Sequence, residues 1–64
     1  METFLLEHKN DKGWYLNSNY GRTGNVFTAR RFLSKVSAEN ERLRCEEFGL
    51  VLKVVKVTVI VEDV

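Results

Sequence analysis

The chain lacks the residue types that several common protein classes depend on: among its 64 residues it has no proline, one cysteine and one histidine. A single cysteine excludes an internal disulfide, and one Cys with one His cannot complete a four-ligand zinc site. No run approaches the roughly 20 apolar residues of a membrane span. The opening METFLLEHKN lacks the cationic start and apolar stretch of a signal peptide. These absences predict a protein of a reducing cytoplasm, without cofactor, metal or membrane contact.

The net charge and the length of the chain exclude further classes of protein. Ten basic and nine acidic residues leave a net charge of +1, which argues against a histone-like nucleic-acid condenser. The composition, 44% hydrophobic and 30% charged, is that of a globular chain rather than a disordered one. Sixty-four residues leave no room for a cofactor domain and a deep substrate cleft beside a core. We therefore expect residues 1–64 to form a single domain.

The first third of the sequence predicts a β-hairpin. Residues 3–8 form a short apolar segment, and the Asn-Asp-Lys-Gly run at 10–13 is typical of a turn, because Asn and Asp bond their own backbone and Gly accepts a positive φ. Residues 14–17, Trp-Tyr-Leu-Asn, then suit a returning strand. Strand alternation separates Trp14 from Tyr15, so one aromatic ring is expected to be exposed.

The segment that follows is irregular by composition. Residues 18–25 are rich in Ser, Asn and Gly and predict a loop. Val26 and Phe27 form either a brief third strand or an anchor for the end of this loop. Residues 28–32 are expected to form one helical turn, with Thr28 as its cap and Phe32 directed inward.

One main helix is predicted between residues 34 and 49. Ser34 is a suitable N-cap, because its hydroxyl can accept a hydrogen bond from a free amide of the first turn. Gly49 can adopt the left-handed conformation that ends a helix. The apolar residues form two stripes rather than one, and together they predict a broad, thin buried face; the stripes comprise Val36 with Leu43, and Ala38 with Cys45 and Phe48.

Residues 50–61, LVLKVVKVTVIV, give the strongest strand signal. The apolar parity switches at Val54–Val55, which predicts a β-bulge that restores one continuous buried face. Twelve residues span about 40 Å, more than the body of so small a domain, so the strand must bend or project. A projecting strand is a template for pairing, and we expect a homodimer or a partner strand at three valines: Val57, Val59 and Val61.

These elements predict an α+β fold: a small antiparallel sheet of three to four strands with one main helix on one face, in the order ββαβ, with a further short strand allowed before the helix. Within it, no constellation indicates an enzyme. His8 has no companion Ser or Asp motif, and Cys45 fits a small apolar position on the helix better than a nucleophile. The Gly21–Gly24 segment lacks the Gly-Lys-Ser/Thr ending of a nucleotide-binding loop.

Charge distribution is more informative than any motif. Residues 12–38 carry five basic side chains and no acidic one, while the rest of the chain carries five basic and nine acidic, so the two parts have charges of +5 and −4. The basic window also contains aromatic rings. Arginine and aromatic residues are enriched in protein-interface hot spots, and the same types can neutralise phosphates and stack on bases. Candidate partner-binding residues are Trp14, Tyr15, Tyr20, Arg22, Arg30, Arg31 and Lys35.

Three interpretations of this surface remain open at the level of sequence. It can bind a protein, it can bind nucleic acid directly or as part of a ribonucleoprotein, or its arginines can simply keep a small domain soluble while the aromatics pack inside. A structural homodimer without a binding role is a further alternative.

The layout resembles short proteins of unknown function encoded by phages of Gram-positive bacteria. The similar elements are the TFLLEHKND opening, the GWYL strand, TARRF, the SKVSAE helix start and the acidic-ended TVIVEDV strand. The loop NSNYGRTGN is particular to this chain. The resemblance implies an accessory protein of the host cytoplasm that inhibits a host enzyme or an immune effector such as a CRISPR nuclease complex. It carries over no functional residue.

Overall fold

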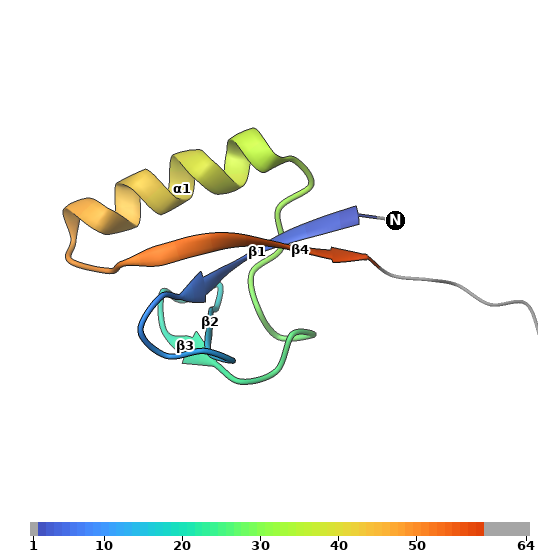
Figure 1. The fold of residues 1–64 in the computed structure, drawn as a ribbon, viewed down its shortest axis with the longest axis horizontal. Coiled ribbons are helices and arrows are strands. Elements are labelled where there is room, and N and C mark those ends of the chain that lie inside the picture. Colours follow the sequence, from blue (N-terminus) through green and yellow to red (C-terminus); the bar gives the residue numbers. More distant parts are fainter. Residues whose placement is uncertain (1, 59–64) are drawn as a thin grey trace, which may run out of the picture.

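The computed structural model describes residues 2–58 as an α+β fold with one helix packed against a four-stranded antiparallel sheet. The strands follow the spatial order β3-β2-β1-β4, which places β1 inside the sheet and β4 at an edge. Figure 1 shows α1 lying along β4 and β1. Along the chain the elements are β1 (Glu2–His8), β2 (Tyr15–Leu16), β3 (Arg22–Thr23), α1 (Lys35–Glu47) and β4 (Leu52–Thr58). The predicted fold class is confirmed.

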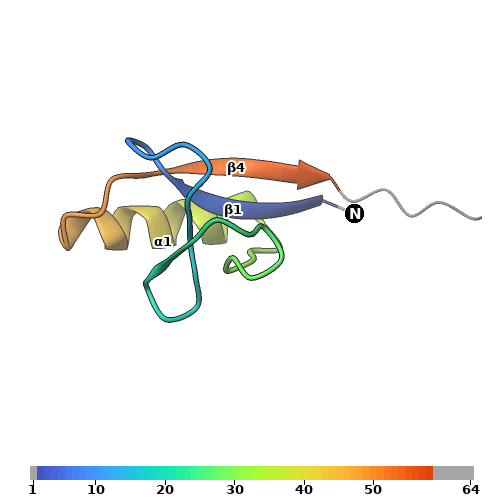
Figure 2. The same cartoon turned by 90° about the horizontal axis from the view of Figure 1, so that it is seen from below.

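Strand β1 is the centre of the sheet, and both of its faces are covered. Successive strand residues point to opposite faces. Leu6 packs with Ala38 and Cys45 of α1, while its neighbour Leu5 lies on the other face, and both leucines are buried. Burial on both faces explains why this strand has a continuous apolar run instead of a strict alternation. Figure 2 shows α1 running alongside the pair of long strands, β1 and β4.

The caps of α1 are those expected from the sequence. Ser34 Oγ accepts a hydrogen bond from the backbone N–H of Ser37 at 3.2 Å, and Gly49 has a φ of +84° directly after the C-cap residue. Only one of the two expected apolar stripes is buried, that of Ala38 and Cys45. These small side chains let the helix approach the sheet closely, which turns the other stripe toward solvent.

The other stripe was expected to be buried, and the structure corrects this expectation. Val36 is 70% exposed and Leu43 is 52% exposed. Phe48, which the sequence groups with Ala38 and Cys45, is also exposed, because it lies at the C-cap beyond the last helical residue.

Residues 26–32 differ from the prediction. They form neither a strand at 26–27 nor a helical turn at 28–32: residues 26–28 form a turn, and Ala29 and Phe32 form isolated antiparallel bridges to Asn17 and Phe4. Phe4 and Phe32 exchange two backbone hydrogen bonds of 2.9 Å each. Because β2 has only two residues, the rest of that edge of β1 needs another partner for its polar groups. Phe32 is buried, as expected.

The expected third strand lies instead within the predicted loop, as β3, where Arg22 pairs with Leu16.

Strand β4 pairs with β1 in unbroken register from Glu2↔Thr58 to His8↔Leu52, so the predicted bulge at Val54–Val55 is wrong. Val54 and Val55 lie opposite Leu6 and Leu5, and since both faces of β1 are apolar, no bulge is needed.

The C-terminal strand starts two residues later than predicted, at Leu52. Of the three valines expected to mediate oligomerisation, Val57 lies in β4, and Val59 and Val61 lie outside the described residues. No helix within residues 2–58 is long and apolar enough to cross a membrane.

Candidate partner-binding surface

Four of the seven candidate residues lie together, and we call them the aromatic–arginine surface: Trp14, Tyr20, Arg22 and Arg30. Two of its side chains, Tyr20 and Arg22, line one shallow cavity of about 300 Å³. Each aromatic ring of the surface is close to one guanidinium group. The surface thus consists of two aromatic–arginine pairs that meet at this cavity.

The first pair is built on the turn between β1 and β2. The N–H of Trp14 donates to the carbonyl of Asp11 at 3.1 Å, which fixes the start of β2. The guanidinium carbon of Arg22 lies 6.0 Å from the centre of the Trp14 ring, and its Nη2 is 2.6 Å from Asp11 Oδ2. The indole remains 45% exposed. Arg22 therefore restrains an exposed aromatic ring while a carboxylate neutralises its charge.

The second pair is built on the turn between β2 and β3. Asn17 Oδ1 accepts hydrogen bonds from the N–H groups of Asn19 (2.9 Å) and Gly21 (2.8 Å). Between them Tyr20 has a φ of +61°, which is uncommon for a residue with a side chain. Its ring is 49% exposed. The side-chain amide of Asn17 thus stabilises a turn that displays a tyrosine.

Arg30 links that tyrosine to the helix. Its guanidinium carbon lies 5.8 Å from the Tyr20 ring centre, and Nη1 donates to the Tyr20 hydroxyl at 3.3 Å. The same Nη1 is 3.7 Å from Glu41 Oε1, and the guanidinium also lies over the Phe32 ring at 5.1 Å. Arg30 is half-buried. Its positive charge, like that of Arg22, lies beside a carboxylate.

His8 also lines the cavity, and its side chain is buried. Its Nε2 has no hydrogen-bond partner among the described residues. Burial lowers the pKa of His8 below its ordinary value of 6.5, and the nearby positive charge of Arg22 lowers the pKa further. The imidazole is therefore neutral at physiological pH.

The thiol of Cys45 is buried against the sheet, 3.8 Å from Glu41 Oε1. Burial raises the pKa of Cys45, and the Glu41 carboxylate raises the pKa further, so the thiol stays protonated. A protonated, inaccessible thiol is a poor nucleophile. Within residues 2–58 no group of three or more His, Cys, Asp or Glu side chains is placed to hold a metal ion.

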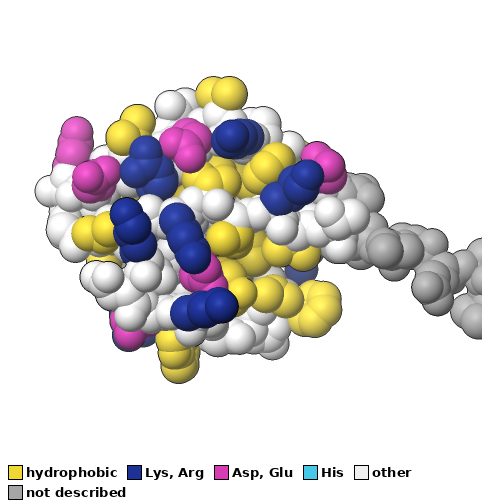
Figure 3. Space-filling model, viewed as in Figure 1, with side chains coloured by type: hydrophobic (Ala, Val, Ile, Leu, Met, Phe, Trp, Pro, Cys, Tyr) yellow, Lys and Arg dark blue, Asp and Glu magenta, His cyan; other side chains and the backbone are white. Residues whose placement is uncertain are grey.

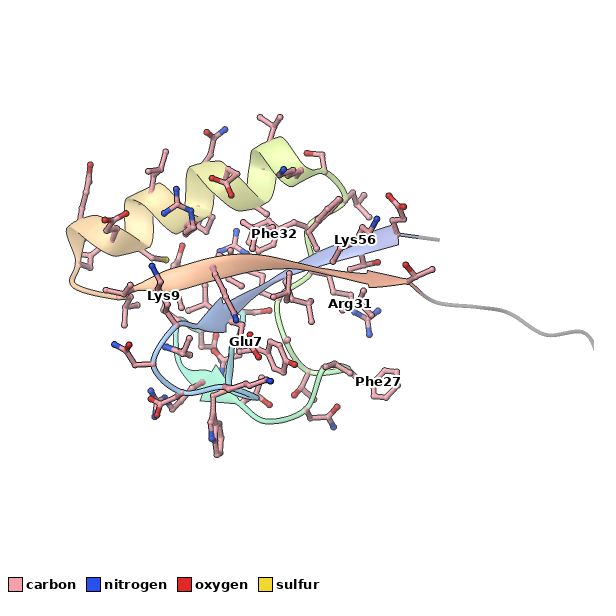
Figure 4. All side chains as sticks on the ribbon, in the orientation of Figure 1. Glu7, Lys9, Phe27, Arg31, Phe32 and Lys56 are labelled. Atoms are coloured by element: carbon pink, nitrogen blue, oxygen red, sulfur yellow. The ribbon has the colours of Figure 1, made fainter. Side chains whose placement is uncertain are left out.

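The other three candidate residues lie elsewhere. Tyr15 is half-buried in β2, where it pairs with Glu7 and Thr23. Arg31 donates to the carbonyl of Phe27 at 3.3 Å, and Figure 4 shows these two side chains toward the end of the molecule where β4 stops. Lys35 begins α1. The seven residues are thus divided among at least three places.

A second cationic region, which the linear charge window did not reveal, lies in a groove of about 710 Å³ between α1 and β4. We call it the β4 groove. Apolar groups of Phe4, Leu52 and Val54 line it between charged side chains. Its charged lining comprises Lys9, Lys35, Arg42, Lys53 and Lys56 with Glu2 and Glu39. Figure 3 shows Lys and Arg side chains around hydrophobic ones on this face.

Four of those cations were missed because they lie outside residues 12–38. Strand pairing and the helix bring them together from distant parts of the chain. No local signal marks them, because Lys53 and Lys56 are three residues apart on a strand and so start from opposite faces of it. Comparison of the chain with protein-family models, with curated proteins and with solved structures gives no match.

Proposed function

We propose that this chain is a small non-enzymatic accessory protein of phage origin that binds and inhibits a host protein, an enzyme or a CRISPR-type immune effector, through the aromatic–arginine surface. The observation that carries the binding role is that Trp14 and Tyr20 are both about half exposed while an arginine restrains each ring. The phage and host setting rests on the resemblance of the sequence to small phage proteins.

Ring restraint matters because ordering a side chain at an interface costs about 0.5–1.5 kcal/mol. A ring that is already held loses less of this freedom on binding. Tyr, Trp and Arg are also the residues that most often dominate interface energies. The pairs Trp14–Arg22 and Tyr20–Arg30 combine these types with preorganisation.

A protein partner is favoured over nucleic acid by the charges of the surface. Arg22 lies 2.6 Å from Asp11, and Arg30 lies 3.7 Å from Glu41. A phosphate would have to compete with these carboxylates and would meet their repulsion. A protein surface can instead bury the rings and leave both ion pairs in place.

A binding role rather than catalysis is favoured by the state of the single histidine and the single cysteine of the chain. Cys45 is buried with a raised pKa, and His8 is buried and neutral. The Cys45 thiol is buried against the sheet, and His8 lines the cavity with its Nε2 buried.

The test is affinity capture from extracts of Gram-positive host bacteria with three forms of the protein: wild type, the double variant Trp14→Ala/Tyr20→Ala, and Leu43→Ala. Leu43 is the matched control, since it is similarly exposed but lies on the outer side of α1. Hot-spot truncation costs about 2 kcal/mol or more, so each aromatic substitution should weaken binding about 30-fold.

We expect a stoichiometric protein that wild type and Leu43→Ala capture and the double variant does not. Adding the purified wild-type protein to that captured target should then inhibit its activity. Equal capture by all three forms, or no captured protein, contradicts the proposal. Nucleic acid as the partner would instead give oligonucleotide binding that falls steeply with salt.

A further inference from the structure

The outer edge of β4 presents backbone groups that no other described residue pairs with as a strand. In an antiparallel pair, alternate residues turn their N–H and C=O groups toward the neighbouring strand. The N–H of Lys9 donates to the carbonyl of Val51 at 3.0 Å, which sets the alternation for the whole strand. Residues 51, 53, 55 and 57 therefore face β1. Leu52, Val54 and Lys56 direct their backbone groups outward, where the sheet formed by residues 2–58 has no further strand.

This edge lacks most of the devices that usually protect one. Edges are blunted by proline, by a bulge, by shortness or by charged side chains, lysine above all. Residues 52–58 contain no proline, and the pairing of all seven with β1 is regular. The two lysines of β4 are bound to β1: Lys53 Nζ lies 3.2 Å from Glu7 and Lys56 Nζ lies 3.4 Å from Glu2. The edge is open to another strand.

Apolar groups flank the open edge on both faces. Val55 and Val57, on the face away from the helix, are half-exposed although they lie opposite the buried residues Leu5 and Thr3. On the helix side, Val54 lines the β4 groove. A strand added at this edge would cover side chains of both faces in addition to satisfying the backbone.

The charged residues that line the β4 groove indicate which charge an occupant should carry. Five cationic and two acidic side chains line it. Arg42, Lys53 and Lys56 are each paired with a carboxylate, whereas Lys9 and Lys35 have no ion-pair partner among the described residues. The cations extend along the strand, with Lys9 and Lys56 at its opposite ends (Figure 4). An occupant with apolar residues beside carboxylates fits this lining.

We infer that the occupant is a second copy of this chain, whose residues 52–62 pair antiparallel with the same residues of the first. After β4 the sequence continues Val-Ile-Val-Glu-Asp at 59–63, outside the described residues. The register that centres on Val57 pairs outward-facing groups with outward-facing groups. It sets Val59 of one copy against Val55 of the other and Glu62 against Leu52, beside the groove cations.

This pairing is isologous, so each copy supplies its acidic residues to the groove of the other. A second copy is favoured over an unrelated peptide because the same chain carries both the open edge and a valine-rich sequence that is followed by Glu62 and Asp63. The dimer contact also uses a different part of the molecule from the aromatic–arginine surface. The inferred dimer can therefore be tested independently of the proposed function.

The experiment is sedimentation equilibrium of the full chain over a range of concentrations. We expect the mass to rise from 7.5 kDa toward twice that value as concentration increases. Val59→Lys places a charge against Val55 and should raise the dimer dissociation constant at least about tenfold, which corresponds to about 1.4 kcal/mol. Leu43→Lys, the same change at an exposed position on α1, should leave the constant unchanged.

Glu62→Lys provides a second variant that leaves the described core intact. It should weaken the dimer, and raising the salt concentration should reduce the difference from wild type. Amide exchange at Val54 and Lys56 should be slow in the wild-type dimer and fast in Val59→Lys. A wild-type protein that stays at 7.5 kDa at all concentrations overturns the inference. So does a Val59→Lys variant that dimerises like Leu43→Lys.

Discussion

The buried carboxylate of Glu7 contacts the β1–β2 turn and β4, and its substitution tests how much these contacts stabilise the hairpin. The residue is 6% exposed. Its Oε2 accepts a hydrogen bond from the N–H of Gly13 at 2.9 Å, and its Oε1 lies 3.2 Å from Lys53 Nζ. One carboxylate therefore connects β1 to the following turn and to β4.

Glu7→Gln keeps the shape of the side chain and removes its charge. Hydrogen bonds to charged groups contribute about 1.5–3 kcal/mol. Because glutamine can still accept from Gly13 while its amide meets the Lys53 ammonium, we expect a loss of about 1–2 kcal/mol in the free energy of unfolding. For a domain of this size that lowers Tm by about 4–16 °C.

Glu2→Gln is the matched control, since Glu2 also lies on β1 and pairs with a lysine of β4 at 3.4 Å. Both members of this pair are more than half exposed, with side-chain exposures of 59% for Glu2 and 55% for Lys56. Exposed ion pairs contribute about 0–1 kcal/mol. We therefore expect Glu2→Gln to change the free energy of unfolding by less than about 0.5 kcal/mol.

Thermal unfolding followed by circular dichroism at several pH values completes the test. The hydrogen bond from Gly13 lowers the pKa of Glu7 below its ordinary value of 4.5; burial opposes this effect and Lys53 adds to it. Because the folded-state pKa is the lower one, the stabilisation is present above the unfolded pKa and is lost as pH falls through the folded pKa. Equal Tm values for Glu7→Gln and Glu2→Gln at pH 7, or a difference that persists in strong acid, would refute this reasoning.

Three further predictions concern His8, Gly49 with Gly24 as its control, and Cys45. Burial lowers the pKa of His8 below 6.5, so the wild-type free energy of unfolding should decrease as pH falls from 6.5 through the lower folded-state pKa, and denaturant titration should show a smaller decrease in His8→Gln. Gly49→Ala should lower the free energy of unfolding by about 1–2 kcal/mol, because Gly49 has a φ of +84°. Gly24→Ala should change it by less than about 0.5 kcal/mol, since a Cβ there would meet only the Trp14 ring at 3.7 Å; equal effects in urea titrations would contradict this. Cys45 should react with a thiol reagent only at the rate of unfolding, and a burst of reaction in native buffer would contradict its burial.

The elements that the sequence predicted correctly are those with local signals. Turn residues mark the hairpin, Ser34 and Gly49 bound the helix, and valines mark the last strand. The errors at residues 26–32 and at Val54–Val55 have a different origin. Both depend on what β1 requires from its neighbours: a partner along its free edge, and apolar side chains on both of its faces. Neither requirement can be read from the local segment.

The candidate site was predicted in part for the same reason. A linear charge window found Trp14, Tyr20, Arg22 and Arg30, which the turns bring together. It also included Lys35, which the helix places in the β4 groove instead. The other groove cations come from the turn after β1, from α1 and from β4, so only the pairing of distant segments brings them together.

The most direct test of the recognition role is a hydrogen-exchange footprint of the protein bound to its captured host partner. The account predicts slowed exchange in residues 14–22 and at Arg30, with little change along the outer side of α1 at Val36 and Leu43. Slowed exchange confined to that outer side, with residues 14–22 unaffected, would contradict it.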